Sequence, residues 1–150
     1  MKTTAAVLTL AVLAAAPAAA QAPKGDTVPA VQALLDAQVA AWNRGDLEAF
    51  MTGYWRSPEL VFCSGATLTK GWDATLERYR RRYQAEGREM GRLGFDAVEI
   101  TQLGPDAAYA RGAYRLRMRD GSEPHGLFTI VLRRFAEGLR IVHDHTSAAE

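Results

Sequence analysis

The chain has 150 residues, a formal net charge of +1 and one cysteine, Cys63. A charge this close to neutral excludes functions that depend on electrostatic capture of nucleic acid or of an anionic membrane. A single cysteine excludes an internal disulfide, so packing alone must hold the fold. Because Cys63 lies inside an apolar run, we interpret it as a small buried hydrophobic residue and not as a nucleophile.

The first 20 residues have the pattern of a secretory signal peptide. A positive charge at Lys2 precedes an apolar run, and small residues precede the expected cleavage site after Ala20. The apolar run is shorter than the ~20 residues that a membrane-spanning helix needs. We therefore expect a periplasmic or secreted protein with no membrane anchor after cleavage. Residues 21–26 form an expected disordered leader, and residues 27–148 suit one domain with its own core.

Hydrophobic periodicity predicts three helices in the first half of this domain. The first runs from Pro29 to Asn43, and Gln38 is the one polar member of its apolar stripe. A short second helix follows Asp46, which can cap it. The third runs from Trp72 to Ala85 and contains the string RYRRRY, residues 78–83. Since acidic residues lie nearby, we interpret that string as a solvated helix face and not as a nucleic-acid site.

The remaining patterns predict strands. Residues 59–64 and 66–69 indicate a short hairpin, and four longer strands cover residues 92–103, 107–119, 125–135 and 138–147. Strict alternation of apolar or small residues with polar residues in the second long strand predicts one buried face and one solvated face, as in an antiparallel sheet. Gly112 and Gly126 are positions where such a sheet can bend. Helices followed by an antiparallel meander indicate an α+β domain with the helices on one sheet face.

Strings along nearly the whole domain resemble the nuclear transport factor 2-like, or SnoaL-like, superfamily. They are AAWNRGDLEAFMTGYW, LVFCSG, KGWDATLERYRRRY, MGRLGF, GLFTIVLRRF and RIVHDHTS. Within the superfamily they are most similar to small secreted SgcJ/EcaC-like domains of unknown function. The resemblance implies a cone-shaped fold in which three N-terminal helices pack on the concave face of a curved antiparallel sheet. It also implies an apolar pocket at the wide mouth of the cone and a homodimer formed through the sheet.

That superfamily includes steroid isomerases, dehydratases, polyketide cyclases, a kinase association domain and transport adaptors, so the fold does not settle the function. In the isomerase branch, the resemblance places a first-helix tyrosine at Gln38 and a general-base aspartate near Phe62 or Cys63. Neither position supplies the required chemistry here, so we do not expect that isomerase mechanism. The cyclase branch needs a carboxylate base in the pocket, and the sequence does not place one.

The last strand contains IVHDHTS, with two of the three histidines of the chain. Simple alternation sends one set of side chains to one face, namely Ile141, His143, His145 and Ser147. Asp144 then points to the opposite face, so an aspartate–histidine dyad is geometrically poor. A zinc site needs at least a third protein ligand beside His143 and His145. The pattern does not provide that ligand, so we expect no metal.

The histidine His145 is the candidate acid/base residue, because imidazole titrates near neutrality and the resemblance puts this strand at the centre of the cone. Hydrogen bonding to a ligand and a purely structural role are the alternatives for this side chain, and either His143 or His145 could face the pocket. The expected ligand-binding residues are four polar points of the pocket and one residue at its rim: Gln38, Tyr54, Tyr114, His145 and, at the rim, Trp55.

The chain has no phosphate-binding glycine loop and no dinucleotide fingerprint, so we expect no cofactor. Our main hypothesis is an exported, homodimeric, single-domain protein whose pocket binds a small, mostly apolar molecule. The first alternative is a proton-transfer enzyme, such as an isomerase, dehydratase or hydrolase, with His145 as acid/base. The second alternative is a structural domain whose cone is filled by its own side chains.

Overall fold

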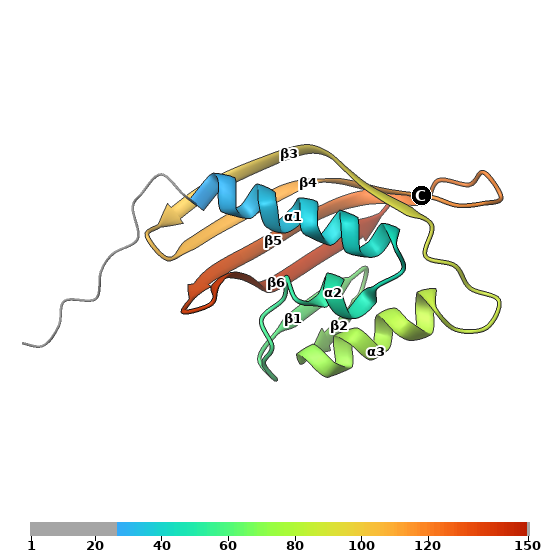
Figure 1. Ribbon diagram of the computed structural model, residues 1–150, viewed down its shortest axis with the longest axis horizontal. Helices are drawn as coiled ribbons and strands as arrows, with labels where there is room; N and C mark the ends of the chain where they lie inside the picture. The colour runs from blue at the N-terminus through green and yellow to red at the C-terminus, as the bar shows by residue number, and fades with distance from the viewer. Residues whose placement is uncertain (1–26, 150) are drawn as a thin grey trace, which may run out of the picture.

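Three helices lie against one face of a curved six-stranded sheet in the computed structural model, which describes residues 27–149 (Figure 1). The helices are α1 (Thr27–Asn43), α2 (Leu47–Met51) and α3 (Trp72–Tyr83). The strands are β1 (Val61–Ser64), β2 (Thr67–Lys70), β3 (Arg92–Gly104), β4 (Ala107–Arg117), β5 (His125–Phe135) and β6 (Gly138–Ala148). The expected signal peptide and leader lie outside the described residues. No helix within 27–149 is long and apolar enough to span a membrane.

Local signals in the sequence set the helix ends. Gly45 adopts a φ of 80°, a left-handed conformation that glycine tolerates, and so closes the chain after α1. The side chain of Asp46 then accepts a hydrogen bond from the backbone N–H of Ala49 at 2.9 Å, which caps α2 as expected. The helix α1 begins two residues earlier than predicted, and α3 ends two residues earlier.

The expected α+β class with helices on one sheet face is confirmed.

The sheet has the order β2-β1-β6-β5-β4-β3, and it is mixed where the sequence predicted only antiparallel pairs. The four long strands form the expected antiparallel meander, whereas β1 pairs with β6 in parallel. The chain before β1 extends this parallel contact, because Ile141 donates to the carbonyl of Gly53 and accepts from the N–H of Trp55, both at 2.9 Å. The segment after α2 is thereby fixed beside the middle of β6.

A β-bulge interrupts the pairing of β6 with β5. Val131 pairs with His143, whereas the next residue, Leu132, pairs with Ile141. Val142 therefore has no partner, and the alternation of inward and outward side chains shifts by one residue at this point. Ile141 before the bulge and Asp144 after it are consequently both buried, with 1% and 4% of their surfaces exposed.

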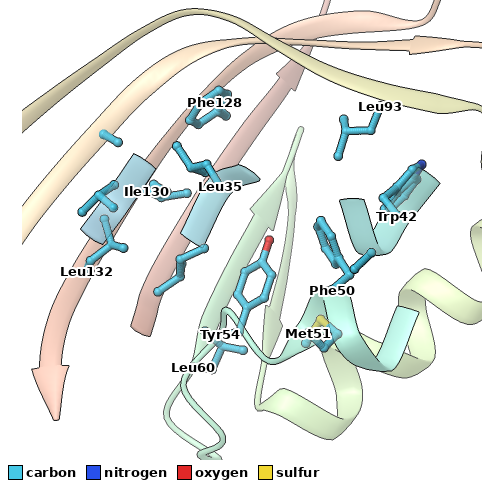
Figure 2. Close-up of a cluster of buried hydrophobic side chains, with 14 of the residues drawn as sticks. Leu35, Trp42, Phe50, Met51, Tyr54, Leu60, Leu93, Phe128, Ile130 and Leu132 are labelled. Carbon is cyan, nitrogen blue, oxygen red and sulfur yellow. The ribbon is translucent and has the colours of Figure 1, made fainter. Parts of the chain in front are cut away.

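A cluster of buried hydrophobic side chains, which includes the aromatic residues Trp42, Phe50 and Phe128, lies between the helices and the sheet (Figure 2). The rings of Phe50 and Tyr83 contact Trp42 edge-on, with centroids 5.1 and 4.8 Å away. The indole N–H of Trp42 donates to the carbonyls of Met90 and Gly91, at 3.1 and 3.2 Å, on the segment that leads into β3. The buried polar atom of this tryptophan is thus satisfied while its ring packs in the core.

The close approach of β5 and β6 at Gly126 gives a test of this packing. A Cβ atom at Gly126 would lie 1.8 Å from the carbonyl oxygen of Ser147. We expect Gly126→Ala to lower the free energy of unfolding by at least about 1–3 kcal/mol, the usual range for overpacking, in urea denaturation. Gly94 of β3 is the matched control, because a Cβ there meets nothing within 4 Å. Equal stabilities of the two alanine variants would contradict the close approach of the two strands.

Candidate functional site

A cavity of about 130 Å³ lies between the helices and the concave face of the sheet. Most of its wall is aliphatic or aromatic, including Leu35, Trp42, Phe50, Phe62, Phe128 and Ile130. An engineered protein cavity of about 150 Å³ is known to bind benzene, so this volume suits a molecule of one ring. The interior of the cone is therefore not filled by its own side chains.

The carboxylate of Asp144 lines this cavity because of the bulge in β6. Without an unpaired Val142, the inward set of Ile141 would continue to His143 and His145. Because Val142 is unpaired, Asp144 takes the inward position, and His145 is exposed on the outer face of the sheet. The predicted placement of His145 in the pocket is therefore wrong. The sequence pattern assumed an uninterrupted strand, and residue types alone do not reveal the bulge.

One oxygen of Asp144 has a protein partner and the other has none. The hydroxyl of Tyr54 donates to Oδ2 at 2.7 Å, across 90 positions of sequence. The second oxygen, Oδ1, is buried and has no hydrogen-bond partner among the described residues. Buried carboxylate oxygens are normally hydrogen-bonded, and leaving one unsatisfied is unfavourable. Asp144 lines the cavity, so its carboxyl group provides an acceptor without a protein partner in the cavity wall.

Burial gives Asp144 a titration near neutrality. Removal from water raises the pKa of its carboxyl to about 7, although the hydrogen bond from Tyr54 acts in the opposite direction. Burial also raises the pKa of Tyr54 and of Tyr79 well above the usual value, and the charge of Asp144 raises both further. The two phenols therefore stay protonated while Asp144 can gain or lose a proton near pH 7. A carboxyl group tuned in this way suits acid/base chemistry.

The buried side-chain amide of Gln38 forms a hydrogen bond with the backbone of α2. Its Nε2 donates to the carbonyl of Phe50 at 3.3 Å, and the side chain is 3% exposed. Gly53 makes room for it, because a Cβ at that position would lie 2.9 Å from Nε2. Gln38 thus forms a polar point in the cavity wall that is fixed to the α2 backbone. The apolar stripe of α1 contains a polar residue for this reason.

The structure brings three of the five predicted site residues together. Gln38, Tyr54 and Tyr114 line the cavity from α1, the segment after α2, and β4. Figure 2 shows Tyr54 with its hydroxyl pointing away from Leu60. Trp55 does not line the cavity: its ring stacks on Phe135 with centroids 5.3 Å apart.

The sequence interpretation missed Asp144 and two arginines of α3, Arg78 and Arg82, which also line the cavity. A signal for the arginines existed, because residues 78 and 82 are four positions apart and so share one side of the helix, adjacent to the side of Tyr79 and Tyr83. Within residues 27–149, no three His, Cys, Asp or Glu side chains are grouped closely enough to hold a metal ion.

Comparison with known proteins gives one family match and several similar structures. A family model described as the SnoaL-like domain matches residues 31–150. A nuclear transport factor 2-like protein of unknown function from Shewanella oneidensis MR-1 is 35% identical, with a TM-score of 0.73 over 80% of this chain and 98% of that one. No curated protein matches the chain.

Two more distant structures share the fold alone. A DUF3225-family protein of unknown function from Pectobacterium atrosepticum SCRI1043 is 22% identical, with a TM-score of 0.68 over 85% of this chain and 94% of that one. A ketosteroid isomerase-like protein from Erwinia carotovora atroseptica SCRI1043 is 23% identical, with a TM-score of 0.62 over 84% and 98%. Proteins with different descriptions therefore share this architecture.

The raised pKa of Asp144 predicts how stability depends on pH. The pKa is about 7 in the folded chain against an ordinary value of 3.8, so between these values the folded state holds a proton that the unfolded chain has lost. The free energy of unfolding should therefore fall as pH rises from about 4 to about 7, by up to about 1.4 kcal/mol per pH unit. Asp144→Asn should lack this contribution. Urea denaturation of both proteins at pH 4, 5.5, 7 and 8.5 measures the difference.

A second variant tests whether the hydrogen bond from Tyr54 lowers the pKa of Asp144. Tyr54→Phe removes the donor that lowers the pKa of Asp144, so the fall in stability should extend to higher pH than in the wild type. Parallel pH profiles for the wild type and Asp144→Asn would show that Asp144 does not titrate in this range.

Proposed function

Because the chain belongs to the SnoaL-like domain family, within the nuclear transport factor 2-like superfamily, we propose that its cavity binds a small, mostly apolar molecule. We further propose that this molecule presents a hydrogen-bond donor to Asp144. One observation carries the proposal: an aromatic cavity contains a buried carboxylate oxygen that has no protein partner among the described residues. The chain has the family and the fold that its sequence predicts.

The two oxygens of Asp144 have different tasks in this proposal. Tyr54 holds Oδ2 and so fixes the orientation of the carboxylate, while Oδ1 accepts from the ligand. The apolar walls exclude water and favour ligands that bury hydrocarbon surface. A ligand without the donor leaves Oδ1 unsatisfied in this environment, so the site discriminates against it.

Proton transfer is the second candidate function, and the pKa of about 7 for Asp144 favours it. In this reaction Asp144 takes a proton from an acidic C–H or O–H group of the substrate and returns it to another atom, as in an isomerisation or a dehydration. Asp144 replaces His145 as the acid/base residue, because His145 lies on the outer face of the sheet. A ketosteroid isomerase-like protein shares this fold.

We also propose that the protein is exported and forms a homodimer. The signal-peptide pattern before Gln21 supports export to the periplasm or the medium. The homodimer would form through the outer face of the sheet, where Leu127 of β5 has 65% of its surface exposed. The cavity faces the helices, so such a dimer leaves it unobstructed.

Phenol and toluene, which have nearly the same shape, test the binding proposal. Phenol carries a donor for Oδ1 of Asp144, so the wild type should bind it about tenfold more tightly than toluene in calorimetric or NMR titration at pH 8.5. Asp144→Asn should lose most of this preference. Thr146→Phe, which adds a ring to the cavity wall, should weaken the binding of both compounds.

The control for this experiment is His145→Ala, since the removed ring is exposed on the opposite sheet face. It should bind both compounds as the wild type does. Equal affinities for phenol and toluene in the wild type would contradict the role of Asp144. Binding that survives Thr146→Phe unchanged would place the ligand outside the cavity.

The proton-transfer candidate predicts a pH profile. In a turnover screen of unsaturated cyclic ketones and aromatic polyketide-like compounds, base catalysis by Asp144 should increase with pH through an apparent pKa of about 7. Asp144→Asn should lower the rate by about 10²–10⁴-fold, the usual contribution of a positioned acid/base group. His145→Ala should leave the rate unchanged, and an active Asp144→Asn variant would refute this mechanism.

A further inference from the structure

The four arginines of α3 divide into two pairs. Arg80 and Arg81 form ion pairs on the surface, with Glu48 at 2.6 Å and with Glu77 at 3.3 Å. Arg78, which is half-buried, and Arg82, which is exposed, both line the cavity, and neither forms an ion pair with a described residue. Their four-residue spacing puts them on one side of the helix. The cavity therefore has two positive charges in its wall that form no ion pair with a carboxylate within residues 27–149.

Neutral contacts hold both guanidinium groups in place. Arg78 donates to the hydroxyl of Thr69 at 2.8 Å, and its Cζ lies 5.2 Å from the ring centre of Phe62. Arg82 donates from Nε to the hydroxyl of Tyr83 at 3.1 Å. A guanidinium has five N–H donors, so each arginine keeps donors for a further acceptor. The groups are positioned without losing their charge.

The positive charges act inside the cavity. Burial raises the pKa of both Tyr114 and Tyr79, and the charges of Arg82 and Arg78, respectively, act in the opposite direction. Tyr114 reaches the cavity from β4, whereas the arginines come from α3. The field of α3 thus extends to hydroxyls of the cavity wall, where an anionic group of a ligand would experience it.

Asp144 requires a hydrogen-bond donor from the ligand, whereas the arginines require an acceptor. It is buried in β6, and its unsatisfied oxygen needs a donor. A negative group placed beside it would be repelled by the ionised carboxylate, so an anionic ligand would put its charge near α3 and a neutral donor near β6. The volume of about 130 Å³ leaves room for one ring between them.

We propose that the ligand is a one-ring organic acid whose carboxylate binds Arg78 and Arg82 and whose hydroxyl donates to Asp144. This inference rests on the proposed function, because it names the class of molecule that the cavity binds. Carboxylates suit arginine, whose planar N–H groups can pair with both oxygens. The two ends of the cavity then recognise two different groups of the same molecule.

The experiment compares acids with their neutral esters. The probes are the three hydroxybenzoate isomers, their methyl esters and phenol. Each is titrated by calorimetry into the protein that begins at Gln21. At least one acid should bind ten or more times more tightly than its own ester. In Arg78→Gln/Arg82→Gln this ratio should fall to near one, while the affinity for phenol stays the same and so shows that the cavity is intact.

The matched control is Arg80→Gln/Arg81→Gln, which removes the same charge from the same helix but outside the cavity. It should keep the preference for the acid. A preference that persists in Arg78→Gln/Arg82→Gln, or falls equally in the control, would overturn the proposal. If phenol binds but every acid binds no better than its ester, the anion site is refuted and the proposed function stands. If none of the probes, phenol included, binds the wild type, both fail.

Discussion

A single unpaired residue in β6 determines the chemistry of the cavity. Val142 has no partner on β5, and the resulting shift turns Asp144 inward and His145 outward. A buried carboxylate is unfavourable by itself, as the upward shift of its pKa indicates. The hydrogen bond from Tyr54 offsets only part of this effect. The fold thus retains a group that weakens it near neutral pH, which is typical of sites under functional constraint.

The position of Tyr54 depends on the same strand. Its neighbours Gly53 and Trp55 are hydrogen-bonded to Ile141, the last paired residue before the bulge. The donor and the acceptor of the Tyr54–Asp144 hydrogen bond are therefore both fixed to one short stretch of β6. A change of register there would move both groups together. This arrangement fixes the position of a residue that lies between α2 and β1.

Most elements could be predicted from the sequence because their signals are local. Gly45 and Asp46 mark the junction of α1 and α2, and alternation marks the long strands to within a few residues. The parallel pairing of β1 with β6 and the bulge at Val142 depend on contacts between distant segments. Periodicity cannot reveal them. Of the proposed site, Gln38, Tyr54 and Tyr114 could be found because their placement does not depend on the bulge, whereas Asp144 could not.

The polar groups of the cavity belong to elements that can vary independently. Asp144 is positioned by backbone pairing within the sheet, whereas Arg78 and Arg82 are presented by the surface of one helix. Replacing residues on that helix face alters the charge of the cavity without disturbing the strand register. Altering the bulge changes which side chain of β6 enters the cavity without disturbing the helix. Because the helix and the sheet supply these groups separately, few substitutions can change the ligands that such a cavity accepts. This is a physical reason why one fold supports many functions.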